Sequence, residues 1–154
     1  LAKARNIPTI VDPKRRNFLN YKGCTLFKPN LKELKEGLKL DFDKADQEEV
    51  KKASCLLQEK LKVKANLITL SEYGVFVSDG KDHHFMPAHL RSISDVSGAG
   101  DTVVSVAALA MAAQLPLKQV AEISNLAGGI VCEYVGVVPI DKDRLNRELQ
   151  GLLN

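Results

Sequence analysis

Residues 95–102 read Asp95-Val96-Ser97-Gly98-Ala99-Gly100-Asp101-Thr102, a glycine-containing loop that leads into a helical pattern. Gly98 and Gly100 can take backbone conformations that other residues avoid, and they let a ligand approach the main chain closely. Residues 102–113 contain no Gly or Pro and are rich in Ala, which predicts a helix. The first amides of a helix lack intrahelical partners and carry partial positive charge, so this loop is a candidate site for a phosphate or a developing oxyanion.

Asp101 stands at the mouth of this loop and has two interpretations. As a helix N-cap it would close a tight strand-to-helix turn, which is the more common outcome for an arbitrary Gly-x-Gly-Asp. As a general base it would take a proton from an attacking hydroxyl, which gives a reason for a carboxylate beside an anion site. The loop is not a Walker loop, because no Gly-Lys-Ser/Thr follows its glycines.

The composition is that of a globular domain with few special features. The chain has 154 residues, of which 45% are hydrophobic, enough for a substantial core. Its formal charge of +3 does not indicate nucleic-acid binding, and no apolar run approaches the about 20 residues that span a membrane. Three widely spaced cysteines suit a reducing compartment better than a disulfide framework. We therefore expect a cytoplasmic protein that binds neither nucleic acid nor membrane.

Strand and helix patterns alternate along the chain. Apolar runs bounded by turn residues predict strands at residues 7–11, 25–28, 65–70, 74–78 and 83–86. Helical patterns cover residues 31–37, 46–61, 102–113, 117–135 and 141–153. Gly37 is expected to end the first helix, and Asp79-Gly80 is a hairpin signal between the last two strands. This order predicts an α/β fold with a largely parallel sheet flanked by helices, whose ligands gather at the carboxyl ends of the strands.

Asn30-Leu31-Lys32-Glu33 follows a predicted strand and opens a helix. One helical turn brings Asn30 and Glu33 to the same face. The pair can form a capping box, or it can order Mg²⁺ through water around nucleotide phosphates, and both interpretations can hold together. Lys14, at another strand end, is either a surface charge or a group that neutralises a bound phosphate.

The segment 95–102 resembles the second signature of the PfkB, or ribokinase-like, carbohydrate kinases, and Asn30 to Glu33 is similar to their Asn-x-x-Glu motif. The resemblance implies that Asp101 is the general base and that the amides of Gly98, Ala99 and Gly100 stabilise the transferring phosphoryl group. It also implies that Asn30 and Glu33 place Mg²⁺ through water. Further residues are implied to contact the nucleotide, which is ATP: Asn30, Leu31, Lys32, Glu33, Lys14, Thr69, Ser71 and Gly74, with Asn125 near the adenine.

Within that family the chain looks most like the heptose-7-phosphate kinase domains of ADP-heptose synthases. The similarity covers about residues 3 to 140, and the segments that carry it are Val11-Asp12-Pro13-Lys14, Phe18, Tyr21-Lys22-Gly23, Thr25-Leu26, Pro29-Asn30-Leu31-Lys32-Glu33, Met86-Pro87, Asp95-Val96-Ser97-Gly98-Ala99-Gly100-Asp101-Thr102-Val103 and Asn125-Leu126-Ala127-Gly128-Gly129-Ile130-Val131. The resemblance implies transfer of the ATP γ-phosphoryl group to heptose 7-phosphate, in synthesis of lipopolysaccharide precursors. The cofactors would be Mg²⁺ and a monovalent cation, and the intact protein would be a homo-oligomer.

The chain resembles only the C-terminal, nucleotide-binding half of such a kinase domain, over residues 1–154. We expect the half that carries the sugar lid to be absent and this piece alone to be inactive. Two alternatives stay open. One is another kinase of the family, acting on a different sugar, a nucleoside or pyridoxal, and the other is a non-catalytic nucleotide-binding module.

Overall fold

A five-stranded sheet forms the centre of the first of the two units into which the chain divides, Leu1–Met86 and Pro87–Asn154. The computed structural model describes residues 1–43, 46–89 and 91–153. The strands follow one another in the sheet as they do in the chain: β1 (Ile10–Val11), β2 (Leu26–Phe27), β3 (Ala65–Thr69), β4 (Val75–Ser78) and β5 (His83–Met86).

The sheet is mixed in direction. β1, β2 and β3 are parallel, whereas β3, β4 and β5 form an antiparallel meander. The hairpin signal is confirmed, because Gly80 has a φ of 88° and Asp79 accepts hydrogen bonds from the amides of Lys81 and Asp82. β1 is shorter than predicted. The amide of Thr9 donates to the hydroxyl of Thr25 at 3.0 Å, so a side chain takes the place of a main-chain acceptor before Ile10, although the carbonyl of Thr9 still accepts the amides of Thr25 and Leu26.

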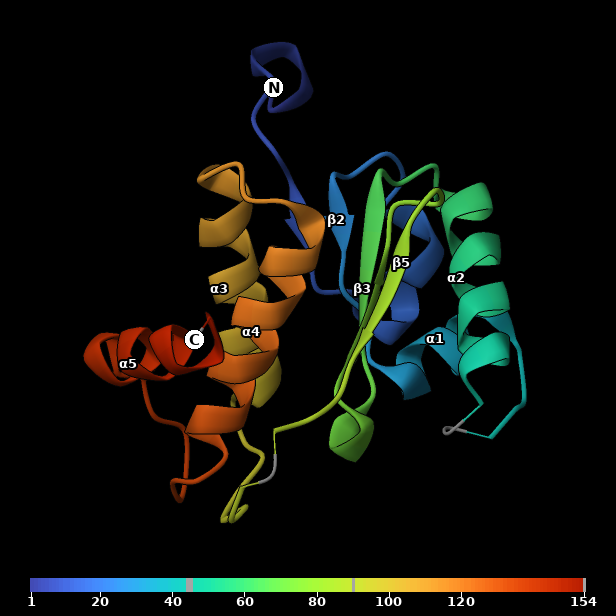
Figure 1. Cartoon of the computed structure of the whole chain (residues 1–154). Coiled ribbons are helices and arrows are strands. Elements are labelled where there is room, and N and C mark those ends of the chain that lie inside the picture. Colours follow the sequence, from blue (N-terminus) through green and yellow to red (C-terminus); the bar gives the residue numbers. More distant parts are fainter. Residues whose placement is uncertain (44–45, 90, 154) are drawn as a thin grey trace. The chain divides into compact units, whose positions relative to one another are not determined.

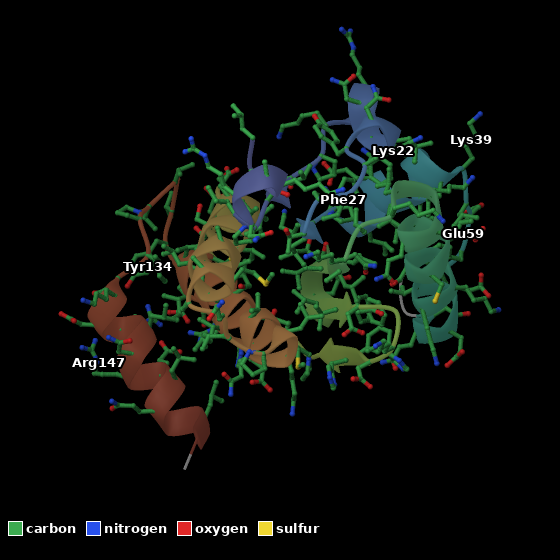
Figure 2. All side chains as sticks on the ribbon, turned by 90° about the horizontal axis from the view of Figure 1, so that it is seen from above. Lys22, Phe27, Lys39, Glu59, Tyr134 and Arg147 are labelled. Atoms are coloured by element: carbon green, nitrogen blue, oxygen red, sulfur yellow. The ribbon has the colours of Figure 1, made fainter. Side chains whose placement is uncertain are left out.

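Two helices cover one face of this sheet, α1 (Leu31–Leu38) and α2 (Gln47–Leu61) (Figure 1). Asp46 caps α2, and the apolar positions of α2 recur on the side that faces the strands. The core between the layers is made of buried side chains from both, centred on Phe27, Leu34, Val50, Ala53, Leu57, Leu61, Ile68 and Phe76. Figure 2 shows Phe27 inside this unit and Lys22, Lys39 and Glu59 at its outer surface.

Gly37 does not end α1, so that prediction is wrong. The helix continues to Leu38 and ends at Lys39, whose φ of 55° is left-handed. A Cβ on Gly37 would lie 2.2 Å from Cδ1 of Phe18. Phe18 is buried and packs edge-on against Phe27, with the ring centroids 5.2 Å apart. The glycine therefore makes room for an aromatic ring inside the helix instead of stopping it.

The described residues of the second unit form three helices, α3 (Ala99–Ala112), α4 (Leu117–Val131) and α5 (Lys142–Leu153). α3 and α4 pack side by side (Figure 1), and a Cβ on Gly128 would lie 2.6 Å from Cγ2 of Val103. α3 begins at Ala99 and not at residue 102, and α4 ends at Val131 and not at residue 135. Within the three described stretches, none of the helices has the length and apolar character needed to span a bilayer.

Candidate functional site

The glycine loop of the second unit ends in the first turn of α3. Gly98 is the N-cap, with a φ of 79° that other residues rarely adopt, and its carbonyl accepts the amide of Thr102 at 2.9 Å. The amide of Ala99 makes a long bond of 3.3 Å to the carbonyl of Val96. The next two amides, of Gly100 and Asp101, belong to the first helical turn, where no carbonyl of the helix lies within reach. This end of α3 can therefore receive an anion.

Asp101 lies in the first turn of α3, three residues after the N-cap. The interpretation of Asp101 as the cap is therefore wrong. Its side chain is exposed, and its carboxylate has no hydrogen-bond partner among the residues that the structure describes. The positive end of the helix stabilises a negative side chain at this position. The arrangement presents an unengaged carboxylate next to the free amides, as a general base requires.

A second segment holds the glycine loop from behind, which sequence reasoning missed. The carbonyl of Cys132 accepts the amides of Ser94 and Asp95 at 2.8 and 3.2 Å. The carboxylate of Asp95 accepts the amide of Ser97 on one oxygen and that of Gly136 on the other, each at 2.9 Å. These hydrogen bonds, that of Ser97 first, hold the pKa of Asp95 below its usual range, so the carboxylate stays ionised and the two segments stay joined.

Asn30 and Glu33 form a capping box at the start of α1. The side chain of Asn30 accepts the amide of Glu33, and Oε2 of Glu33 accepts the amide of Asn30, both at 2.8 Å. The box leaves the other carboxylate oxygen, Oε1, for water. Among the described residues, no group of three or more His, Cys, Asp or Glu side chains is arranged to hold a metal directly. Since Mg²⁺ usually keeps several of its waters, the pair fits a water-mediated site.

The structure brings Asn30 next to Thr69, within the first unit. The two residues form an isolated parallel bridge, and the amide of Thr69 donates to the carbonyl of Pro29 at 3.1 Å. Beyond Thr69 the backbone bends sharply, because Ser71 has a φ of 54° and Gly74 a φ of 92°. A serine in the left-handed region is uncommon, and strained backbone of this kind is concentrated at functional sites.

The other candidates of the first unit differ in their surroundings. Lys14 and Lys32 are exposed, and neither has an ion-pair partner among the described residues, whereas Leu31 packs against the core. Sequence reasoning missed Lys28, a buried side chain whose Nζ lies 3.0 Å from Oδ1 of Asp12. The sequence did contain a signal for this pair, because Lys28 directly follows the apolar strand β2 and Asp12 directly follows the neighbouring strand β1.

Asn125 lies on α4 and is half-buried. Its amide nitrogen Nδ2 donates to the carbonyl of Pro87 at 2.8 Å, at the start of the second unit. The side chain thus has a structural role that the sequence did not predict. The carbonyl oxygen Oδ1 remains for a further partner.

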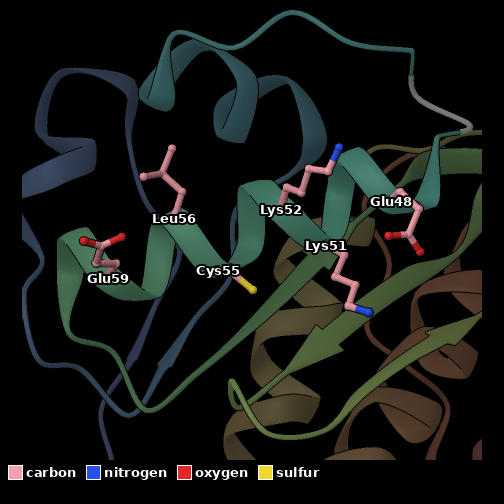
Figure 3. Close-up of a pocket in the computed structure, with 6 residues that line it drawn as sticks. All are labelled: Glu48, Lys51, Lys52, Cys55, Leu56 and Glu59. Carbon is pink, nitrogen blue, oxygen red and sulfur yellow. The ribbon is translucent and has the colours of Figure 1, made fainter.

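A shallow hollow lies elsewhere, on the surface of α2. Figure 3 shows the six side chains that line it, Glu48, Lys51, Lys52, Cys55, Leu56 and Glu59. The two acids and two lysines balance in charge, and none of the residues predicted to bind nucleotide is among them. We therefore assign it no part in the chemistry.

The chain resembles known proteins in sequence. The sequence model of the family described as pfkB family carbohydrate kinase matches residues 1–143. The Bifunctional protein HldE of Pseudomonas aeruginosa (strain LESB58) is 40% identical over 150 residues, which are 97% of this chain and 31% of the relative. The Bifunctional protein HldE of Methylobacillus flagellatus is 38% identical over 150 residues, or 97% and 30% of the two chains. The chain thus spans less than a third of the length of these relatives.

Solved structures agree on the fold. Phosphofructokinase-2 from Escherichia coli, in complex with potassium, superposes with a TM-score of 0.87 at 22% identity, over 99% of this chain and 50% of that one. Ribokinase from Thermotoga maritima superposes with a TM-score of 0.77 at 21% identity, over 97% and 51% of the two chains. The α/β, ribokinase-like fold is therefore confirmed.

Proposed function

The chain belongs to the pfkB family of carbohydrate kinases, and on that premise we propose that it transfers the γ-phosphoryl group of ATP to a hydroxyl of a sugar or sugar phosphate. One observation carries the proposal. The unengaged carboxylate of Asp101 stands in the first turn of α3, beside amides that have no carbonyl of the helix within reach. One turn of helix thus offers a carboxylate that can accept the proton of the nucleophile. It also offers amides that can donate to the charged oxygens of a transferring phosphoryl group.

In the proposed reaction, Asp101 accepts the proton of the sugar hydroxyl. The hydroxyl oxygen forms its bond to the γ-phosphorus as the bond to the β,γ-bridging oxygen breaks, and ADP leaves with that electron pair. The amide of the N-cap Gly98 and those of Ala99, Gly100 and Asp101 in the first turn stabilise the negative charge on the phosphoryl oxygens. The amide of Ala99 is partly engaged by the carbonyl of Val96 at 3.3 Å, which makes it a weaker donor to the phosphoryl group.

The remaining roles follow the same proposal. Asn30 and Glu33 hold Mg²⁺ through water, and the ion neutralises charge on the nucleotide phosphates when bound. Thr69, Ser71 and Gly74 lie along the phosphates, Lys14 and Lys32 add positive charge, and Leu31 supports the turn from the core. Asn125 contacts the adenine through its Oδ1. We also propose that a monovalent cation binds, because phosphofructokinase-2 from Escherichia coli was solved in complex with potassium.

We propose heptose 7-phosphate as the acceptor, in ADP-heptose synthesis for lipopolysaccharide precursors. Support comes from the 40% identity to HldE across 97% of this chain. The chain is then the C-terminal half of a kinase domain, the sugar lid belongs to the other half, and the intact protein is a cytoplasmic homo-oligomer. Three free cysteines, of which Cys24 and Cys132 are buried, are compatible with a reducing compartment.

The decisive experiment is Asp101→Asn in the complete protein that contains this chain, assayed with ATP and heptose 7-phosphate. Asparagine keeps the shape of the side chain but cannot accept the proton, so kcat should fall by about 10²–10⁴-fold while KM for ATP stays nearly unchanged. Asp141→Asn is the control, because Asp141 likewise stands at a helix start, but its carboxylate is engaged there by the amides of Asp143 and Arg144. Near-normal kcat in Asp101→Asn would contradict the role of Asp101 as the base, and a wild type that binds ATP without transferring its phosphoryl group would favour a nucleotide-binding module. A panel of other sugars, nucleosides and pyridoxal tests the acceptor.

A further inference from the structure

Four charged side chains of the second unit form a closed cluster, which we call the Arg91 cluster: Arg91, Glu133, Arg144 and Glu148. Each arginine contacts both glutamates. Nη1 of Arg91 lies 2.6 Å from Oε1 of Glu133, and Nε of Arg144 lies 2.8 Å from Oε1 of Glu148. The cluster joins three segments, because Arg91 precedes the glycine loop, Glu133 follows α4, and the other two residues lie on α5.

Arg91 is the most enclosed member of the cluster. Only 8% of its side chain is exposed, and it crosses α4 at Gly129, where a Cβ would lie 3.0 Å from its Nε. Burial alone would lower the pKa of Arg91, but the hydrogen bonds that it donates to Glu148 and Glu133, with the charges of these carboxylates, outweigh burial and raise the pKa. The helix thus has a residue without a side chain where the buried arginine passes. Such close fitting at a conformationally costly glycine indicates a fixed position for Arg91.

Arg144 closes the cluster from α5. It stacks over the ring of Tyr134, with 5.7 Å between the guanidinium carbon and the ring centroid, and donates to the Tyr134 hydroxyl at 3.0 Å. Figure 2 shows Tyr134 next to α5. Glu133 and Tyr134 are therefore both held by one arginine, and with them the backbone that leads from α4 into residues 132–137.

Residues 132–137 are the segment that holds the glycine loop from behind. Cys132, the neighbour of Glu133, receives the amides of Ser94 and Asp95, and the amide of Gly136 binds the carboxylate of Asp95. Val137 completes the contact, since a Cβ on Gly98 would lie 2.9 Å from its Cγ1. Arg91 lies a few residues before the glycine loop, and its ion pair with Glu133 binds it to the start of residues 132–137.

We propose that Arg91 is a positioning residue for the glycine loop: through Glu133 it fixes residues 132–137, and these fix Asp95 and Gly98 at the start of α3. The ligand of the loop rests on the proposed function, but the connection from Arg91 through residues 132–137 to the loop does not. A cluster that only attached α5 would leave the loop unchanged when broken. A positioning cluster transmits the change to amides that Arg91 itself does not touch.

The first test is amide hydrogen exchange on this chain in the wild type, Arg91→Met, Arg144→Met and Lys118→Met. Arg91→Met should speed exchange at the amides of Ser94, Asp95 and Gly136 by about tenfold, with no change at Leu67 in β3. Arg144→Met, at a more exposed residue, should give a smaller increase at the same amides. Lys118→Met breaks an exposed ion pair with Glu122 on α4 and should change none of them.

The second test separates positioning from mere stability. In the complete protein, Arg91→Met should lower kcat by about tenfold at an unchanged KM for the sugar, and Arg91→Lys should recover part of the loss because it keeps the charge. Unchanged exchange at Ser94, Asp95 and Gly136 in Arg91→Met overturns the inference. If that variant does not fold, unchanged exchange in Arg144→Met overturns it instead. A wild type without kinase activity refutes the proposed function alone, because the exchange experiment needs no substrate.

Discussion

Nζ of Lys28 lies 3.0 Å from Oδ1 of Asp12, and this ion pair joins the ends of β2 and β1 directly before the Asn30 turn. The amide of Lys28 also donates to the carbonyl of Val11 at 2.8 Å. On the other side, the amide of Thr69 donates to the carbonyl of Pro29. The turn that carries Asn30 is therefore fixed from both neighbouring strands.

Lys28→Met should destabilise the protein by about 2–4 kcal/mol, because it leaves Asp12 without its buried partner. The value lies below the upper limit for buried pairs, since Asp12 is 25% exposed. The midpoint of urea unfolding measures the effect. Lys118→Met, which removes an exposed lysine from a pair of 3.7 Å, is the control and should leave the midpoint unchanged. Equal midpoints for the two variants would show that the Lys28 pair contributes nothing.

Gly98→Ala should weaken nucleotide binding and stability more than Gly136→Ala. Both glycines have a φ of 79°, so both substitutions carry the left-handed cost of about 1–2 kcal/mol. Only at Gly98 would the new Cβ meet Val137, at 2.9 Å, whereas nothing lies within 4 Å at Gly136. Overpacking at Gly98 should add about 1–3 kcal/mol. Thermal melting and ATP titration compare the two, and equal losses would show that Val137 gives way freely.

Glu33→Gln should raise the Mg²⁺ concentration needed for activity in the complete protein. Glutamine can still accept the amide of Asn30, so the free energy of unfolding should change by less than about 1 kcal/mol. The control is Asp46→Asn, which alters the cap of α2 where Asp46 accepts the amide of Glu49 at 3.1 Å. That variant should leave the Mg²⁺ requirement unchanged, with a similarly small change in stability. A Mg²⁺ titration of both variants, beside their melting curves, decides whether Glu33 is more than a cap.

Stability should fall on acidification as the two glutamates of the Arg91 cluster are protonated and its two arginines lose their partner charges. Hydrogen bonds donated by Arg144, and to a lesser extent by Arg91, lower the pKa of Glu133 below its ordinary value of 4.5. The pKa of Glu148 is lowered too, mainly by its hydrogen bond from Arg91. A lowered folded pKa means that the unfolded chain binds protons more readily. The contribution is therefore complete above pH 4.5 and is lost as the pH falls through the folded pKa.

Glu133→Gln should remove part of this acid dependence and lower stability at neutral pH. Urea midpoints between about pH 3 and pH 7 measure both effects, and the slope below pH 4.5 should be shallower in the variant than in the wild type. Identical slopes would mean that Glu133 titrates alike in the folded and unfolded chains.

Local patterns were enough to predict most of the fold. β5 matches its predicted range, and β3 and β4 each differ by one residue, because apolar runs and the Asp79-Gly80 turn are local signals. Gly37 misled the prediction because a helical glycine has two meanings, and only the packed ring of Phe18 distinguishes them. The predicted end of α4 was late for a similar reason. Residues 132–135 keep an apolar pattern although their backbone turns to hold the glycine loop.

The candidate site was predictable only where its chemistry follows a contiguous motif. Asp101 and the capping box of Asn30 and Glu33 belong to such motifs. The contacts that support them do not, since Arg91 reaches Glu148 across 57 positions and Asp95 reaches Gly136 across 41. No spacing rule connects residues that far apart, because the pairing depends on how the helices pack.

α4 contains two adjacent glycines, and their consequence concerns how the second unit acquires its structure. Each glycine inside a helix costs about 1 kcal/mol relative to alanine, so a peptide of this sequence forms little helix on its own. Gly128 receives Val103 and Gly129 receives Arg91. α4 is therefore stable only together with α3 and the loop segment that pack against its glycines. We expect these parts of the second unit to form together, in one cooperative transition.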